Sequence, residues 1–327
     1  MAVFAIAATF LAGLAACGGG ADAAGTAANG ETTVQVGALS NGAATETPIT
    51  VSTVEEIRAT LPQAIRDSGT LTIGSGSLPA GSPPLGYTGT DQQTLTGSEP
   101  DLARLVAGVL GLKPEFQVST WENLFVGIDS GRVDVGFSNI TDTEERKKKY
   151  DFASYRQDNL GFETLASNPW AFTGDFHQLA GLRTSVSKGT NQEKILLEWQ
   201  TKLRAEGKDV AIQYYPDINA VQLALGSGQI DAYLGPNPGL VYQVKQVEGT
   251  PSPKKVAGTY SGAGETLQGL IAATVKKDSG LAQPLAAAIN HLIENGQYSA
   301  WLQAWGLSNE ALPRSEVNPP GLPITNT

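Results

Sequence analysis

The sequence predicts an α/β fold built from two βαβαβ units, and three observations support this prediction. Short runs of β-branched and other apolar residues alternate with longer segments that carry apolar residues at helical spacing. The segment IDSGRVDVGF (128–137) returns 97 residues later as LGSGQIDAYL (225–234). Gly and Ser also stand where several predicted strands end. Since helices separate the strands of each unit, each unit is expected to hold a parallel sheet.

The first unit begins at about Thr53 with an amphipathic helix over 54–68. The pattern then predicts strand 70–73, helix 99–111, strand 113–118, helix 121–130 and strand 133–138. Leu102, Leu105 and Val109 share one face of helix 99–111, and Gly111 is its stop signal. This is one complete βαβαβ unit.

The second unit repeats this order and is followed by a return to the first. It comprises strand 183–186, helix 192–206, strand 210–214, helix 219–225 and strand 230–234. Two crossings, near 156–160 and 264–268, lead to strand 270–275, helix 281–294 and a final helix in which Tyr298, Leu302 and Trp305 pack inward. We therefore expect lobe 1 at 49–157 plus 268–327, with the Pro-rich tail wrapped on it, and lobe 2 at 158–267.

Composition excludes several classes of function. The chain has 327 residues, 41% of them hydrophobic, with a net charge of −10. This charge argues against a nucleic-acid partner, which requires clustered Lys and Arg. Neither His177 nor His291 follows a predicted strand end, and the sequence has no catalytic-triad or metal-ligand spacing. We expect a monomer that is not an enzyme and needs no metal or cofactor.

The N-terminus indicates export. Its first 16 residues are apolar and uncharged, fewer than the ~20 that a membrane-spanning helix requires, so a cleaved signal peptide over 1–17 fits better. Leu14 to Cys17, followed by glycines, resembles a bacterial lipobox, which implies lipidation of Cys17 and a membrane anchor. A buried core segment with a free Cys is the alternative. Residues 18–48, rich in Gly, Ala, Thr and Asn, predict a flexible tether.

Polar residues stand where strand 133–138 runs out. Ser138, Asn139 and Thr141 occupy this position, and Arg146 lies close to the start of a predicted helix. Open parallel sheets bind ligands at the carboxyl ends of their strands. An Arg is unfavourable in the first turn of a helix, whereas its guanidinium suits a carboxylate in bidentate fashion. A carboxylate-binding Arg and a plain surface Arg are both compatible with the residues.

A longer set of motifs resembles the family 3 solute-binding proteins of polar amino-acid ABC importers. From about Ser68 to Gly306 the chain carries, in order, PPLGYTG, LTGSEPDLARL, STWENLF, SGRVDV and TDTEERKKKYDF. The resemblance implies a type II periplasmic-binding-protein-like fold, two lobes on a two-crossing hinge. It also implies capture of a small carboxylate-bearing ligand and its delivery to a membrane permease, outside the cytoplasmic membrane or in the periplasm.

The resemblance also implies roles for individual residues. Arg146 would clamp the ligand α-carboxylate with help from Thr141, and the Ser138 carbonyl would accept from the ligand amine. Trp121 and Tyr87 would line the ligand. A core aromatic is the alternative for Trp121, and Tyr87 lies in a loop whose length differs from that of the family. From the KGTNQEK turn, the implied contacts to the carboxylate are Thr190, Asn191 and Gln192. A structural N-cap explains Thr190 equally well.

The chain departs from the family pattern at the ammonium site. Where an acid usually ends the last strand of the second lobe, the sequence reads Gly-Pro-Asn-Pro (235–238), and 74–77 likewise holds no acid. Another carboxylate could rotate in, Asn237 could accept from a neutral amine, or the ligand could lack a free ammonium. Polar amino acids and derivatives such as opines stay open as ligands. The alternatives are a sensor for a membrane receptor and a dehydratase, for which Glu265 is the acid to watch.

Overall fold

The computed structural model of the chain describes residues 24–26 and 30–325. The predicted signal peptide and Cys17 lie outside these residues. Within the described part of the chain, no helix combines the length and the apolar character that crossing a membrane requires.

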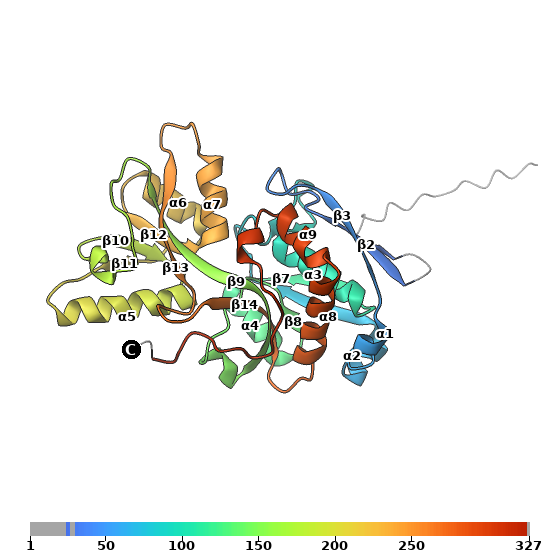
Figure 1. Ribbon diagram of the computed structural model, residues 1–327. Coiled ribbons are helices and arrows are strands. Elements are labelled where there is room, and N and C mark those ends of the chain that lie inside the picture. The colour runs from blue at the N-terminus through green and yellow to red at the C-terminus, as the bar shows by residue number, and fades with distance from the viewer. Residues whose placement is uncertain (1–23, 27–29, 326–327) are drawn as a thin grey trace, which may run out of the picture.

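Two lobes share one nine-stranded sheet through a single long strand, β9 (Tyr150–Leu165). Its first half pairs with β14 (Gly269–Lys276), and its second half pairs with β12 (Ala232–Pro236) and β13 (Lys254–Ser261). The change of partners falls between Asp158 and Asn159. β9 and the connection 262–268 are therefore the two crossings between the lobes, and β9 runs through the middle of the molecule (Figure 1).

Lobe 1 is built on a parallel set of three strands in the order β7-β4-β8. Its main elements are α1 (Glu55–Arg58), α2 (Gln63–Ser68), β4 (Thr70–Ser75), α3 (Ser98–Val109), β7 (Lys113–Val118), α4 (Trp121–Ser130), β8 (Val135–Gly136), α8 (Ala282–Glu294) and α9 (Gln297–Ala304). A short hairpin, β5 (Tyr87–Thr88) with β6 (Leu95–Thr96), precedes α3. α3 is buried along its whole length, and Tyr298, Leu302 and Trp305 pack in the same core as predicted.

Lobe 2 has the same strand order, β11-β10-β12, with all pairs parallel. Its elements are β10 (Arg183–Val186), α5 (Asn191–Ala205), β11 (Ala211–Gln213), α6 (Ile218–Gly226), β12, α7 (Asn237–Gln246) and β13. Phe162, Phe172 and Trp199 form an aromatic core. The fold predicted from the sequence, two α/β lobes on two crossings, is the observed one.

The N-terminal segment corrects one prediction. β1 (Ala24–Thr26), β2 (Glu31–Val36) and β3 (Thr47–Ser52) form an antiparallel sheet, and α3 packs against its last two strands. Val34 and Val36 are both 0% exposed. The predicted tether over 18–48 is therefore wrong for residues 30–48, because alternate residues of β2 point into the core of lobe 1.

Two predicted helices also differ. The helix over 54–68 is divided into α1 and α2, with Pro62 preceding α2 where its missing N–H costs nothing. Arg146 does not begin an α-helix: Arg146–Lys148 is a single 3₁₀ turn before β9 begins at Tyr150. The chain has too few residues there to complete helical turns before it rejoins the sheet.

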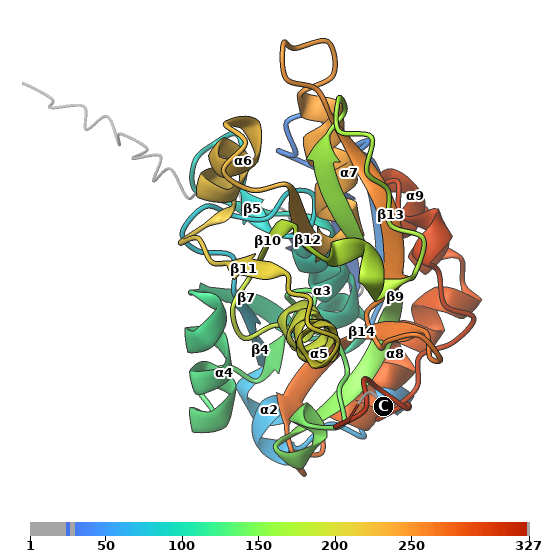
Figure 2. The same cartoon turned by 90° about the vertical axis from the view of Figure 1, so that its left-hand side faces the viewer.

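The C-terminal tail reaches farther than predicted. After a 3₁₀ turn, η3 (Ser308–Glu310), it follows lobe 1, where the amide of Ser154 donates to the Glu316 carbonyl at 3.0 Å. It then leaves lobe 1: Leu322 is 0% exposed in the core of lobe 2, and Lys194 of α5 donates to the Pro323 carbonyl. Both ribbon views show the last described residues of the tail below α5 (Figures 1 and 2). The tail is a third link between the lobes.

Candidate functional site

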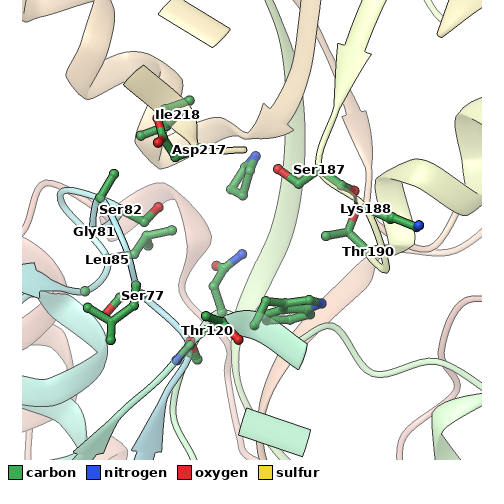
Figure 3. A pocket seen from close by; sticks show the side chains of 18 of the residues that line it. Ser77, Gly81, Ser82, Leu85, Thr120, Ser187, Lys188, Thr190, Asp217 and Ile218 are labelled. Carbon is green, nitrogen blue, oxygen red and sulfur yellow. Dashed lines mark hydrogen bonds between the residues drawn. The ribbon is translucent and has the colours of Figure 1, made fainter. Parts of the chain in front are cut away.

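A cavity of about 340 Å³ lies between the lobes at the carboxyl ends of the parallel strands. Lobe 1 contributes the loop after β4, the start of α4 and the residues after β8, and lobe 2 contributes 186–188, 190–192, 215–218 and Pro236. Figure 3 shows Ser77, Ser82 and Thr120 on one side of this space and Ser187 and Thr190 on the other. The position agrees with the rule that open α/β sheets bind ligands beyond their strand ends.

Six of the predicted site residues line the cavity. They are Trp121, Ser138, Asn139, Thr190, Asn191 and Gln192. Trp121 begins α4 and Asn191 begins α5, so both stand at helix starts that face the cavity. Thr190 also caps α5, since its hydroxyl accepts from the amide of Glu193 at 3.2 Å. Thr190 therefore both lines the cavity and caps α5.

Tyr87 and Asn237 lie elsewhere. Tyr87 is 8% exposed in the core of lobe 1, where its hydroxyl donates to the Ser40 carbonyl at 2.7 Å. The expectation that Tyr87 lines a ligand is therefore corrected: the N-terminal segment that was expected to be a tether covers it. Asn237 is the first residue of α7 and is not among the lining residues, whereas its neighbour Pro236 is.

Arg146 lies beside the cavity, outside its lining, and partly buried. Its Nη1 donates to the Thr141 carbonyl at 2.8 Å and its Nη2 to the Gly189 carbonyl of lobe 2 at 3.3 Å. The guanidinium carbon lies 5.4 Å from the ring centroids of both Trp121 and Phe125. Burial lowers the pKa of Arg146 to about 10, and among the described residues no carboxylate forms an ion pair with it.

Thr141 is also outside the lining. Its side chain faces the carboxylate of Asp158, a residue that the sequence analysis did not single out. Its hydroxyl donates to Oδ2 of Asp158 at 2.7 Å. The side-chain nitrogen of Asn191 donates to the same oxygen at 2.9 Å and to the Gly262 carbonyl at 3.0 Å. Asp158 lies at the crossing point of β9, and its burial raises its pKa to about 6. An acid in the middle of a predicted crossing was the signal that could have found it.

A second buried charge cluster lies under the first-lobe side of the cavity. Arg156 pairs with Glu99 at 3.1 Å and with Glu310 from the start of the tail, and it donates to Asn139. Glu99 also accepts from the Tyr155 hydroxyl and from the amide of Asn139 at 2.9 Å. This cluster holds Asn139 at a φ of +53° after β8. Sequence reasoning missed all of its charged members because their partners are distant in the chain.

The charged groups on the cavity wall are few. Glu99 is in the lining but forms an ion pair with Arg156. The other charged lining residues are Glu122, Asp217 and Lys188. Glu122 is exposed, and Asp217 caps α6 by accepting from the amide of Ala220 at 3.0 Å. Lys188 points away from the space between the lobes (Figure 3). The described residues contain no cluster of acids, His and Cys that could hold a metal ion.

A family model described as bacterial extracellular solute-binding proteins, family 3, matches residues 77–308. The chain belongs to this family. The arginine-binding protein ArgT of Corynebacterium glutamicum is 28% identical over 273 residues, which cover 81% of this chain and 83% of ArgT. The L-cystine-binding protein TcyJ of Escherichia coli is 30% identical over 247 residues, or 73% of this chain and 82% of TcyJ. Both relatives are named as amino-acid-binding proteins.

Solved structures agree with this solute-binding protein in fold. An ancestral arginine-binding protein bound to arginine superimposes with a TM-score of 0.62 at 26% identity, covering 72% of this chain and 98% of its own. The same ancestral protein type bound to glutamine gives 0.61 at 25% identity over 73% and 98%. The predicted family and type II fold are thus confirmed. The residues beyond the family match at 77–308 include the N-terminal sheet and the tail.

Proposed function

We propose that this solute-binding protein captures an amino acid, or an amino-acid derivative with a free carboxylate, in the cavity between its lobes. The lobes would then present the closed form to the permease of an ABC transporter, as the family and the names of its relatives suggest. We also propose that the mature chain is a monomer, anchored through Cys17 on the outer side of the membrane, and that it binds its ligand without catalysis. Binding by closure of two lobes on a hinge is a common mechanism for such folds.

One observation carries this proposal: Arg146 is a partly buried cation whose partners in the described structure are main-chain carbonyls. A desolvated guanidinium gains most from an anion, and a carboxylate matches its fork geometry. Trp121 stacks near Arg146 and also lines the cavity, so the guanidinium lies one side chain away from the space that a ligand would fill. A ligand carboxylate could replace the Gly189 carbonyl, the longer of its two hydrogen bonds.

Thermal unfolding with candidate ligands tests the proposal. The chain from Ala24 onward is screened against amino acids, opines and small carboxylates, with Arg146→Ala beside it. A ligand at a hundred times its Kd should stabilise the protein by about 2.7 kcal/mol. Loss of the charged hydrogen bonds in Arg146→Ala should weaken that ligand roughly 100-fold, since such bonds contribute about 1.5–3 kcal/mol.

The matched control is Arg132→Ala, which removes an exposed arginine side chain of the same lobe whose hydrogen-bond partner among the described residues is the Ser130 hydroxyl. It should bind as the wild type does. Stabilisation that is equal in wild type and Arg146→Ala would remove Arg146 from the ligand site. If no compound with a carboxylate stabilises the wild type, the proposed ligand class is excluded.

A further inference from the structure

The orientation of the Asn191 side chain can be deduced from its partners. Its side-chain nitrogen has two hydrogens, and both are used: one faces Oδ2 of Asp158 at 2.9 Å, the other the Gly262 carbonyl at 3.0 Å. A carbonyl oxygen, and at neutral pH an ionised carboxylate, can only accept hydrogen bonds. An amide turned the other way would place three oxygens together, so the nitrogen must lie on this side.

The oxygen of the same amide therefore faces the other way. Asn191 lines the cavity, and its Oδ1 has no hydrogen-bond partner within the described residues. Asn191 thus presents an acceptor to the cavity, whereas a residue that holds a ligand carboxylate must present a donor. This corrects the role that the family resemblance gave to Asn191.

We propose that Asp158 fixes Asn191 so that its amide oxygen receives the protonated amine of the ligand. The inference rests on the proposed function and deepens it, because it concerns the second polar group of the same ligand: the carboxylate lies at Arg146 and the ammonium at Asn191. Asp158 does not touch the ligand. It is a positioning residue that also supplies negative charge directly behind the amide, which offsets the cost of bringing a cation into the cavity.

The other carboxylates near the cavity are less suited to this role. Glu99 is occupied on both oxygens, by Arg156 on Oε1 and by Asn139 and Tyr155 on Oε2. Glu122 is exposed to solvent. Asp217 is the one rival, since only its Oδ1 is engaged in capping α6 within the described structure. Asn191 and its buried partner thus account for an amine site where the loop 74–77 and the end of β12 hold no acid.

The test compares ligands that differ only in the α-amine. Two pairs are measured by titration calorimetry at pH 7.5: L-arginine with 5-guanidinopentanoate, and L-glutamine with 4-carbamoylbutanoate. In the wild type, at least one amino acid should bind roughly 10-fold or more tightly than its partner without the amine. In Asp158→Asn, whose amide can donate and let Asn191 turn over, the ratio should fall to about threefold or less.

Two further variants make the outcome decisive. Asn191→Leu keeps the volume but removes the oxygen, and should lower the ratio as Asp158→Asn does, which covers the case that Asp158→Asn fails to fold. Asp217→Asn, a matched loss of charge that preserves the cap, should leave the ratio unchanged. An unchanged ratio in Asn191→Leu, or a ratio lowered only in Asp217→Asn, overturns the proposal, as does wild-type protein that binds both members of each pair equally.

A ligand-free measurement separates this inference from the proposed function. If none of the four compounds binds, the proposed function fails for them, and the side-chain amide of Asn191 is then followed by NMR hydrogen exchange. Its two protons should exchange at least 10-fold more slowly than those of an exposed Asn, and this protection should be lost in Asp158→Ala. Exchange at the rate of an exposed amide in the wild type overturns the orientation itself.

Discussion

Gly262 and Asp158 lie against each other where the second crossing passes behind the cavity. A Cβ at position 262 would stand 1.7 Å from Oδ2 of Asp158 and 2.2 Å from its Cγ, far inside any non-bonded contact. The Gly262 carbonyl meanwhile accepts from Asn191, and its amide donates to the Asp158 carbonyl at 2.9 Å. The missing side chain is what allows the carboxylate to reach Thr141 and Asn191.

Gly262→Ala should therefore lower the free energy of unfolding by about 1–3 kcal/mol, as forced overpacking does. Urea unfolding measures the effect. Gly226→Ala at the end of α6 is the matched control, because a Cβ there meets no atom within 4 Å. It should change stability by under about 1 kcal/mol, in the stabilising direction. Equal effects of the two substitutions would mean that position 262 is not tightly packed.

At residue level, the sequence could indicate which candidate residues reach the cavity, but not their hydrogen bonding. Trp121, Ser138 and Asn191 could be placed at the cavity because parallel strands and the helices after them all end at one edge of the sheet. The orientation of Asn191 depends on Asp158, 33 residues earlier, and no local pattern encodes such a pair. Tyr87 was misplaced for the same reason, since its partner Ser40 lies 47 residues away.

At the scale of elements, the N-terminal sheet is an integral part of lobe 1. Alternate residues of β2 and β3 enter the main core, where Val34, Val36, Ile49 and Val51 are each at most 5% exposed. On the other side of this contact, a Cβ at Gly108 of α3 would lie 2.5 Å from Val51. The N-terminal sheet and α3 are thus tightly packed against each other.

A fragment that starts at Thr53 should consequently be less stable than one that starts at Ala24. The fragment lacks four buried valine and isoleucine side chains, each of which contributes about 1.5–3 kcal/mol by its burial, and the face of α3 that they cover would be exposed. We expect a fall in Tm of more than about 10 °C, or aggregation, measured by scanning calorimetry. Identical Tm values for the two fragments would show that the sheet adds nothing to the core.

The loop between β8 and β9 makes stability depend on pH. Burial raises the pKa of Asp142, which is 0% exposed in this loop, to about 7, with Nζ of Lys147 lying 3.4 Å from its Oδ1. Burial also raises the pKa of Asp158 and of Asp101 to about 6. In the unfolded chain these acids ionise near pH 4, so between about pH 4 and 7 the folded state holds more protons. The free energy of unfolding should therefore fall as pH rises through this range.

Asp142→Asn removes one of the three buried acids whose pKa is raised, and with it that acid's contribution to the pH dependence of stability. Between pH 6 and 8 the variant should lose about 1 kcal/mol less stability than the wild type, and at pH 8 it should be at least as stable. Urea unfolding at pH 5, 6, 7 and 8 gives the comparison, with exposed Asp67→Asn on α2 as the control. Parallel curves for wild type and Asp142→Asn would contradict a raised pKa at this position.

The elements that the sequence predicted have clear local patterns, whereas β13, which it missed, depends on pairing with a distant strand. Strands β7 and β10 and helix α4 have the predicted bounds, because each has a clear period and a Gly, Ser or Thr at its end. No helix was predicted over 237–246, where α7 lies, although Pro238 is compatible with the first turn of a helix. The sequence also missed β13, whose place is set by pairing with β9 rather than by its own pattern.

At the scale of the whole molecule, the tail adds a contact across the hinge that lies beyond the family match at 77–308. Leu322 forms a bridge with Thr143 in lobe 1 while its side chain is buried in the core of lobe 2. Gly321 lies so close to Asp142 that a Cβ would stand 2.5 Å from its carbonyl oxygen. Opening the cleft must therefore either carry the tail along or detach Leu322 from one lobe.

Leu322→Ala should lower the free energy of unfolding by about 2–4 kcal/mol, as do other deletions of a fully buried Leu side chain. It should also shift the ligand-free protein toward an open form, seen as a larger radius of gyration in X-ray scattering. Ile324→Ala, at a side chain that is 51% exposed, should change neither quantity. A radius of gyration that is the same in wild type and Leu322→Ala would mean that the tail does not restrain the lobes.

Because the tail is attached to both lobes, a label near its end can report lobe movement. Glu316 is held by Ser154 of lobe 1, whereas Pro323, seven residues later, is held by Lys194 of lobe 2. A fluorophore at Thr325 would travel with lobe 2 for as long as Leu322 and Pro323 stay attached to that lobe, and a second one at the exposed Arg132 position would travel with lobe 1. Energy transfer between the two would then follow each opening and closing of the cleft in single molecules, without any label inside the cavity.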